Sequence, residues 1–439
     1  MQTFNKLFRN KQLSLLVCMS LVITFLLYVR DIVGISVPRY SFLAFILIIA
    51  IQQKVDYIVS TIAFLLPLTC GIPNNILLFS LMVILIYKCN TENTFKSKSM
   101  VNLAIILCLW EFFHLILNPS GNIDIIPYLG YIASLFFLLV IPSFPLSARI
   151  NWSRALLFFC FGTCVLLLFI RLNFENVLGA DFYEEGMRLG SVEQYTGQDD
   201  VIMLRTNANN IGLYSATAIS IALCLYYYKK INVFILGLLF AISYSSGILS
   251  ISRTWAICIG ITIIWFLIIQ KENRIRNIVI LSLIIIAGYY YVTAINPSIL
   301  DAFTARFNED DVNSGAGRSE IMSEYSNYLV EHPFRLLIGS GAINYGDVIT
   351  EIKHSVHNGT QQIIVSYGLM GFLCFIIPFC NFLKKRYVKG QTMALLPLIC
   401  TGIFLQTLQF LNPSFNMYPF MASMFVINMV NSKFTYTRK

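Results

Sequence analysis

The sequence predicts an all-α, polytopic integral membrane protein with about 14 transmembrane helices, 439 residues in all. Two observations lead to this prediction. First, 57% of the residues are hydrophobic and only 12% are charged, whereas an ordinary soluble domain carries about 25% charged residues. Second, apolar runs of about 20 residues, the length that crosses a bilayer, recur along the whole chain. The net charge of +9 therefore does not indicate nucleic-acid binding, and we expect no nucleic acid partner.

The apolar runs follow one another in three groups, separated by two long loops. Before the first loop, the predicted helices are 12–29, 35–52, 55–70, 73–89, 100–117, 123–142 and 155–171. Between the loops they are 205–228, 232–249, 253–270 and 277–295. After the second loop they are 360–382, 392–410 and 414–431. The third and fourth are short, because LLPLTCGIPNN between them carries helix-interrupting prolines, and they form either two spans or one re-entrant pair.

This pattern divides the chain into five parts. They are the N-terminal helices 1–7 (1–171), an external loop (172–204), helices 8–11 (205–295), a large external loop (296–359) and helices 12–14 (360–439). Loops longer than about 12–15 residues are usually functional or disordered. In the large loop, four apolar or aromatic residues are spaced so that they share one face of a helix: Ile321, Tyr325, Tyr328 and Leu329. We therefore expect an amphipathic helix, lying either along the bilayer surface or as a lid over a cavity.

The basic residues predict how the chain is oriented. Short loops rich in lysine and arginine stay in the cytoplasm, and with the N-terminus inside, about two thirds of the 31 basic residues fall in inner loops. The outer side is then net acidic, and the basic residues that remain there are arginines with one exception. We predict a multi-pass protein of the cell inner (cytoplasmic) membrane with both termini in the cytoplasm.

The cysteines and acidic residues give no metal or disulfide pattern. None of the 11 cysteines lies in a long outer loop, which argues against a disulfide framework and against a thiolate zinc site. The outer loops also contain no Asp-x-Asp string and no cluster with metal-ligand spacing. We expect neither a metal nor a cofactor.

Four basic residues at the outer ends of helices are candidates for a functional site. Arg205 in LRTNANNIGLY and Arg253 in SISRTW each open a predicted helix, Arg318 lies at the start of the amphipathic helix, and His357 precedes the twelfth span. Taken singly, each arginine also fits a side chain that reaches up to the interface. Arginine binds phosphate oxygens through two parallel hydrogen bonds, and histidine exchanges a proton near neutral pH. Together they indicate a site for an anionic ligand.

At these residues the chain resembles the superfamily of O-antigen polymerases and O-antigen ligases, which are bacterial integral membrane glycosyltransferases. His357 and Asn358, followed by Gly368 and Gly371, look like that family's His-Asn motif with its trailing Gly-x-x-Gly. GAGRSEIMSEYSNYLVEHPF followed by IGSG resembles its outer-loop helix and glycine pair, and RTNANNIGLY and SRTW resemble its arginine segments. The resemblance covers roughly residues 200–375.

The resemblance implies a GT-C-like polymerase that transfers a growing O-antigen or capsule glycan from undecaprenyl pyrophosphate to an incoming lipid-linked repeat unit. His357 would take the proton from the acceptor hydroxyl. Arg205, Arg253 and Arg318 would hold the pyrophosphate, and Arg318 would also act in catalysis. The implied partners are the undecaprenyl pyrophosphate-linked oligosaccharide, the lipid bilayer, a chain-length regulator and a flippase. The implied reaction uses no metal.

Alternative functions stay open. An O-antigen ligase, which transfers the glycan to lipid A core or protein, would share all of these residues. A flippase or transporter of lipid-linked glycan is less favoured, because the chain shows no internal repeat and the loop histidine lies away from the midplane where transporters bind substrate. A purely structural envelope protein would not need the arginines and the histidine.

Accessory positions have two interpretations each. Asn209 and Asn358 either orient sugars or cap helices, and Arg335 either attracts phosphate or is a solvated surface residue. Glu320, in the first turn of the amphipathic helix, is a further accessory candidate.

Glu111 and His114 form an ionisable pair one turn apart in the predicted helix 100–117. Such intramembrane pairs often mark a site. They either hydrogen-bond each other and hold helices together, or contact the glycan.

Overall fold

The structure is a computed structural model that describes residues 10–72, 74–92, 98–116, 125–145, 149–178, 188–190, 204, 206–270, 274–290, 293, 300–301, 304, 318–343, 345–352, 354–411 and 414–437. Helices make up most of these residues, and no strand occurs among them. The prediction of an all-α chain is confirmed for the part of the chain that the structure describes.

Each predicted membrane segment contains a helix. The first group is α2 (Lys11–Asp31), α3 (Arg39–Gln52), α4 (Val55–Leu65) with the 3₁₀ turn η1 (Leu66–Leu68), α5 (Asn74–Thr91), α6 (Lys98–Ile116), α7 (Ile125–Ser143) and α8 (Trp152–Leu178). The second is α9 (Ala208–Tyr227), α10 (Val233–Leu249), α11 (Arg253–Ile269) and α12 (Arg274–Tyr290). The large loop holds α15 (Arg318–Glu331), α16 (Pro333–Ile338) and α17 (Tyr345–Val348). The last group is α18 (Gly359–Arg386), η5 (Thr392–Leu395) with α19 (Leu396–Leu405), and η6 (Ser414–Asn416) with α20 (Met417–Thr437).

The lengths of these helices support a polytopic membrane protein. Among the described residues, six helices are long and apolar enough to cross a membrane, namely α2, α5, α7, α8, α9 and α18. Six further apolar helices in other predicted segments are shorter, with 10–17 residues. The total of about 14 spans stays a prediction from hydropathy.

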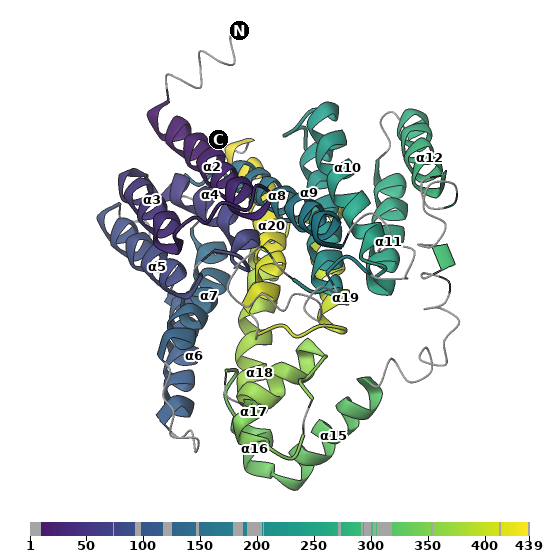
Figure 1. The fold of residues 1–439 in the computed structure, drawn as a ribbon. Coiled ribbons are helices and arrows are strands. Elements are labelled where there is room, and N and C mark those ends of the chain that lie inside the picture. The colour runs from purple at the N-terminus through teal and green to yellow at the C-terminus, as the bar shows by residue number, and fades with distance from the viewer. Residues whose placement is uncertain are drawn as a thin grey trace.

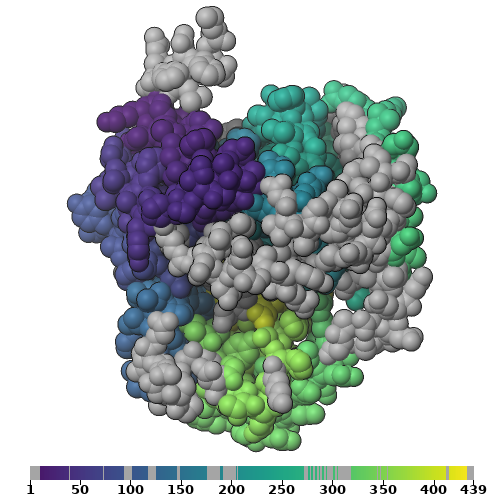
Figure 2. All heavy atoms as spheres, viewed as in Figure 1, coloured from purple at the N-terminus to yellow at the C-terminus, as the bar shows by residue number. Residues whose placement is uncertain are grey.

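The helices surround a central group formed by α8, α9 and α20. Figure 1 shows α3, α5 and α6 on one flank and α10, α11 and α12 on the other, and Figure 2 shows the same two flanks with all atoms drawn. The helices of the large loop, α15 to α17, form one end of the molecule. The start of α2 and the end of α20 lie at the opposite end (Figure 1).

Helix α9 lies in the core, and many of its residues are small. Nearly all of its residues are buried, and serine, threonine, alanine and glycine let neighbouring helices approach closely. A Cβ on Gly212 would lie 3.1 Å from the Cβ of Ser252, just before α11. The hydroxyl of Ser215 accepts a hydrogen bond from Trp255 Nε1 at 2.8 Å and donates to Ser243 O of α10 at 2.6 Å. These contacts fix the start of α11 against the start of α9.

The short third predicted segment, which contains α4, is enclosed by protein. Every residue of α4 except Asp56 is buried, and so is η1 with Pro67. A Cβ on Gly162 of α8 would clash with the carbonyl oxygen of Phe64, so a glycine is what permits this close packing. Helix α4 is therefore a buried helix of the bundle. It ends at Leu65, so it is shorter than the 55–70 segment predicted from hydropathy.

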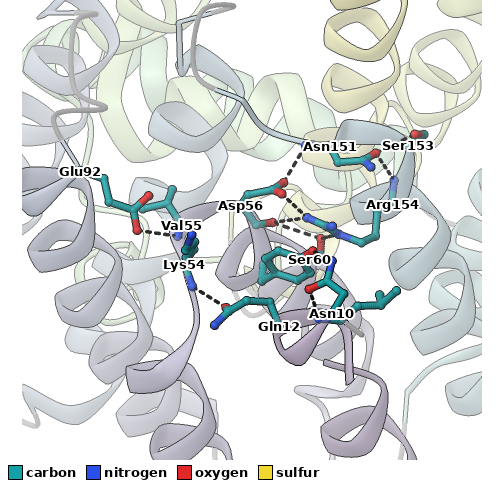
Figure 3. A network of polar contacts seen from close by, with 12 residues as sticks. Asn10, Gln12, Lys54, Val55, Asp56, Ser60, Glu92, Asn151, Ser153 and Arg154 are labelled. Carbon is teal, nitrogen blue, oxygen red and sulfur yellow. Dashed lines mark hydrogen bonds and ion pairs between the residues drawn. The ribbon is translucent and has the colours of Figure 1, made fainter. Parts of the chain in front are cut away.

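A polar network joins four helix ends at the face that carries the start of α2 (Figure 3). The backbone N–H of Lys54 donates to Gln12 Oε1 at 2.9 Å, and that of Val55 donates to Glu92 Oε1 at 3.3 Å. Asp56 forms an ion pair with Arg154. The structure therefore brings Lys54, Asp56, Glu92 and Arg154 together on one face.

Candidate active site

The start of α18 carries the His-Asn motif. Asn358 is the N-cap, since its Oδ1 accepts from the N–H of Gln361 at 3.0 Å and its Nδ2 donates to Gln406 O at 3.2 Å. Of the two interpretations of Asn358, helix capping is the one that the geometry shows. His357 precedes this cap and is half-buried. The cap therefore fixes the backbone next to the imidazole.

The surroundings of His357 favour its neutral form. Burial lowers its pKa below the ordinary value, and the positive charge of Arg318 and the nearby His354 lower it further. Desolvation and a like charge both disfavour a charged imidazole. A neutral imidazole has one nitrogen free to accept a proton, so His357 is suited to act as a base near pH 7.

Helix α15 begins with Arg318, the charge that acts on His357. Its apolar face, with Tyr325, Tyr328 and Leu329, packs against Val356 and against other residues of α17 and α18. Tyr325 Oη donates to His354 O at 2.8 Å. The helix predicted from the periodicity is thus confirmed, and its apolar face packs against other protein residues.

A glutamine ties α15 to α18. Gln361 Nε2 donates to Met322 O at 2.8 Å and to Ser326 Oγ at 3.2 Å. Its Oε1 is buried and has no hydrogen-bond partner among the described residues. The sequence analysis missed this residue, although a pair of glutamines at the start of an apolar helix is a detectable signal.

The residues that directly follow α19 connect the start of α11 to the start of α18. Arg253 is the first residue of α11 and is half-buried. Its neighbour Thr254 shares a hydrogen bond of 3.3 Å with Thr407. The adjacent Gln406 donates to Thr360 Oγ1 at 3.2 Å and accepts from Asn358. Residues 406–407 therefore bridge the starts of α11 and α18, and the two predicted site residues Arg253 and His357 flank this bridge.

The start of α9 adjoins the start of α11. Asn207 is the N-cap of α9 and accepts from the N–H of Asn210 at 2.9 Å. Asn209, for which capping was one interpretation, instead accepts from Ser252 Oγ at 3.5 Å. Arg205 lies outside the described residues. Its neighbour Leu204 is buried, and the Leu204 N–H donates to Asp31 Oδ2 at 3.3 Å.

The two glycine motifs of the resemblance pack against each other. Helix α18 is interrupted at Gly368, where φ is +67°, and Gly339 has φ +80°. At the break, the N–H of Ser340 donates to Val365 O at 2.8 Å and that of Gly341 donates to Ser366 O at 2.9 Å. A Cβ on Gly368 would clash with Leu337 O, and a Cβ on Gly339 would clash with the backbone of Ser366. We call this contact the glycine joint, and it docks the large loop on α18.

Helix α6 holds the glycine joint from the other side. Glu111 Oε1 accepts from the N–H of Ala342 at 2.7 Å, and Trp110 Nε1 donates to Ile338 O at 2.9 Å and to His114 Nε2 at 3.0 Å. The predicted hydrogen bond between Glu111 and His114 is not found in the described structure. Glu111 instead accepts from the large loop, and His114 accepts from Trp110.

The accessory charges have modest roles in this geometry. Arg335 Nη1 donates to Gly339 O at 3.4 Å, which makes it part of the glycine joint. Glu320 is exposed in the first turn of α15, where a negative charge favours the helix dipole. No group of three histidine, cysteine, aspartate or glutamate side chains that could hold a metal occurs among the described residues.

Comparison with known proteins gives one match over this region of the chain. Residues 236–376 match the family model described as O-antigen ligase. This range contains Arg253, Arg318, His357 and both halves of the glycine joint. No curated protein matches the chain. Residues 236–376, about a third of the chain, are therefore similar to the O-antigen ligase family, whose members are glycosyltransferase-like enzymes.

Proposed function

We propose that the protein is a polysaccharide polymerase of the cell inner membrane. It would transfer a growing O-antigen or capsule glycan from undecaprenyl pyrophosphate to an incoming lipid-linked repeat unit at the outer face. The observation that carries this proposal is the proximity of His357, with its lowered pKa, to Arg318, on two elements that pack together at the start of α18.

In this proposal the acceptor hydroxyl attacks the anomeric carbon of the donor glycan. The bond from the acceptor oxygen to that carbon forms as the bond from the carbon to the pyrophosphate oxygen breaks. The hydroxyl proton passes to the neutral imidazole of His357. A positioned general base contributes about 10²–10⁴ in rate.

The leaving pyrophosphate gains negative charge, and arginines stabilise it. Arg318 and Arg253 carry a permanent charge and match phosphate geometry, and Arg205 completes the proposed set. Arg318 and Arg253 are the first residues of α15 and α11, where helix dipoles also favour an anion, and Arg205 precedes α9 in the sequence. Arg318 then has two roles, because the charge that would hold the pyrophosphate also keeps His357 neutral.

The ligase alternative has an observation of its own, since the matching family model carries that description. Deletion of the gene, followed by gel display of surface polysaccharide, separates the two. A single repeat unit on the final acceptor would indicate a lost polymerase. Chains of normal length retained on the lipid carrier would indicate a lost ligase and would overturn the polymerase proposal.

A further inference from the structure

A second site lies at the opposite end of the bundle. A cavity of about 1140 Å³ is lined by the turn between α9 and α10, the end of α11 and the turn after α18. Helices α9 and α11, with 20 and 17 residues, begin at the candidate active site and end at this cavity. At about 1.5 Å per residue, the two sites are roughly 25–30 Å apart. The cavity therefore does not belong to the glycosyltransferase site.

The rim of this cavity is basic. Lys229 and Lys230 line it, and Lys389 is exposed beside the lining residue Gly390. Arg276 Nη2 donates to Tyr226 Oη of the lining at 3.1 Å, which places a guanidinium at the rim. None of the described lining residues is acidic; they are Tyr226, Tyr227, Tyr228, Lys229, Lys230, Ile231, Asn232, Ile235, Ile268, Ile269, Gln270, Gly390 and Gln391. These charges and hydroxyls suit a phosphate-bearing anion.

Lys229 occupies a backbone position that favours glycine. Its φ is +55°, and the N–H of Lys230 donates to Leu225 O at 2.8 Å, which closes the helix by a Schellman motif. Glycine is the usual residue there, because a side chain in this conformation is strained. Orientation in the membrane does not require the lysine, since Lys230 already supplies a charge to the same turn. The strain points to a role for the Lys229 side chain itself.

The other wall of the cavity is apolar. Ile231, Ile235 and Ile268 belong to the lining, and Val233 and Phe234 in the first turn of α10 are exposed. An apolar wall next to a basic rim fits a molecule with a charged head and an acyl chain.

We infer that this cavity binds the phosphate headgroup of an anionic lipid, with Lys229, Lys230 and Arg276 around the phosphate and the isoleucines along the acyl chains. Basic pockets between transmembrane helices are known to bind such headgroups on the side that the positive-inside rule makes cytoplasmic. A soluble phosphate compound offers the same anion without the acyl chain, and the test below distinguishes the two sources.

The test uses the full-length protein, purified in a neutral detergent. Native mass spectrometry measures retention of phosphatidylglycerol, with phosphatidylcholine and inorganic phosphate as comparison probes. We expect phosphatidylglycerol to be retained in preference to phosphatidylcholine. Lys229→Gly and Lys230→Gln should each weaken retention about fivefold. Lys54→Gln, which removes an exposed lysine from the polar network at the same end of the molecule, is the matched control and should bind like the wild type.

The Lys229→Gly variant separates binding from folding. It relieves the left-handed strain, so its melting temperature should equal or exceed that of the wild type while its lipid retention falls. Equal retention by the wild type and both cavity variants would overturn the inference. Retention of inorganic phosphate with the same dependence on the lysines, but no preference for phosphatidylglycerol, would assign the cavity to a soluble phosphate compound and would overturn the lipid assignment.

Discussion

Replacing Gly368 with alanine should open the glycine joint. The φ of +67° at this position costs a residue with a side chain about 1–2 kcal/mol. The new Cβ would also clash with Leu337 O, so the loop must move away. Its departure breaks the hydrogen bonds of Ser340 to Val365 and of Gly341 to Ser366, each worth about 1 kcal/mol. The docked state should therefore lose roughly 3–4 kcal/mol, which is about 10²–10³-fold in its equilibrium constant.

Hydrogen exchange measures this loss directly. The amides of Ser340 and Gly341 should exchange about 10²-fold faster in Gly368→Ala, because local opening becomes easier. Gly346→Ala is the control, since a Cβ at that position in the same loop meets no atom within 4 Å, and its exchange should match the wild type. Unchanged protection of the two amides in Gly368→Ala would show that the joint does not hold the loop.

Four further predictions concern the site and its support. His357→Ala should abolish polymer while leaving membrane insertion intact, and near-normal chain length would remove His357 from catalysis. Because the neutral imidazole is the active form and its pKa is lowered, kcat/KM should fall only as the pH drops through that lowered value. Arg318→Gln removes one cause of the lowering, so the acid limb of the profile should move to higher pH; an unmoved limb would contradict the pairing. Glu111→Leu leaves the N–H of Ala342 unpaired and should cost about 1–3 kcal/mol in thermal unfolding, whereas Glu111→Gln keeps an acceptor and should cost less. Arg253→Gln should lower kcat/KM for purified lipid-linked donor roughly 10–100-fold, and an unchanged value would exclude Arg253 from the pyrophosphate site.

The positions of the helices could be predicted because hydropathy is a local property. Each apolar run contains a helix, and the periodicity in the large loop located α15 correctly, with Tyr325, Tyr328 and Leu329 buried. The end of α4 at Leu65 could not be predicted in the same way. Whether a short apolar helix spans the membrane or is enclosed depends on packing against α8, where Gly162 meets Phe64, and a run of apolar residues looks the same in both cases.

The contacts of the candidate site residues could not be predicted from the sequence. Gly339 and Gly368 were singled out separately, and only the structure shows that they meet across the glycine joint. Glu111 and Ala342 are 231 residues apart in the chain, so no local pattern connects them. Asn358 was open between two interpretations because an asparagine before an apolar helix suits both capping and sugar binding.

The caps of the helices bear on which residues bind the anion. Asn207, Ser252 and Asn358 each accept a hydrogen bond from a backbone N–H of the helix that they precede, at the starts of α9, α11 and α18. Each cap satisfies one of the unpaired N–H groups through which a bare helix N-terminus would bind a phosphate. The dipoles of the three helices still favour negative charge there, but each cap leaves one N–H group fewer to contact an anion. In the proposed site this favours the side chains of Arg253, which opens α11, and Arg205, which precedes α9 in the sequence, over the capping residues as ligands of the pyrophosphate.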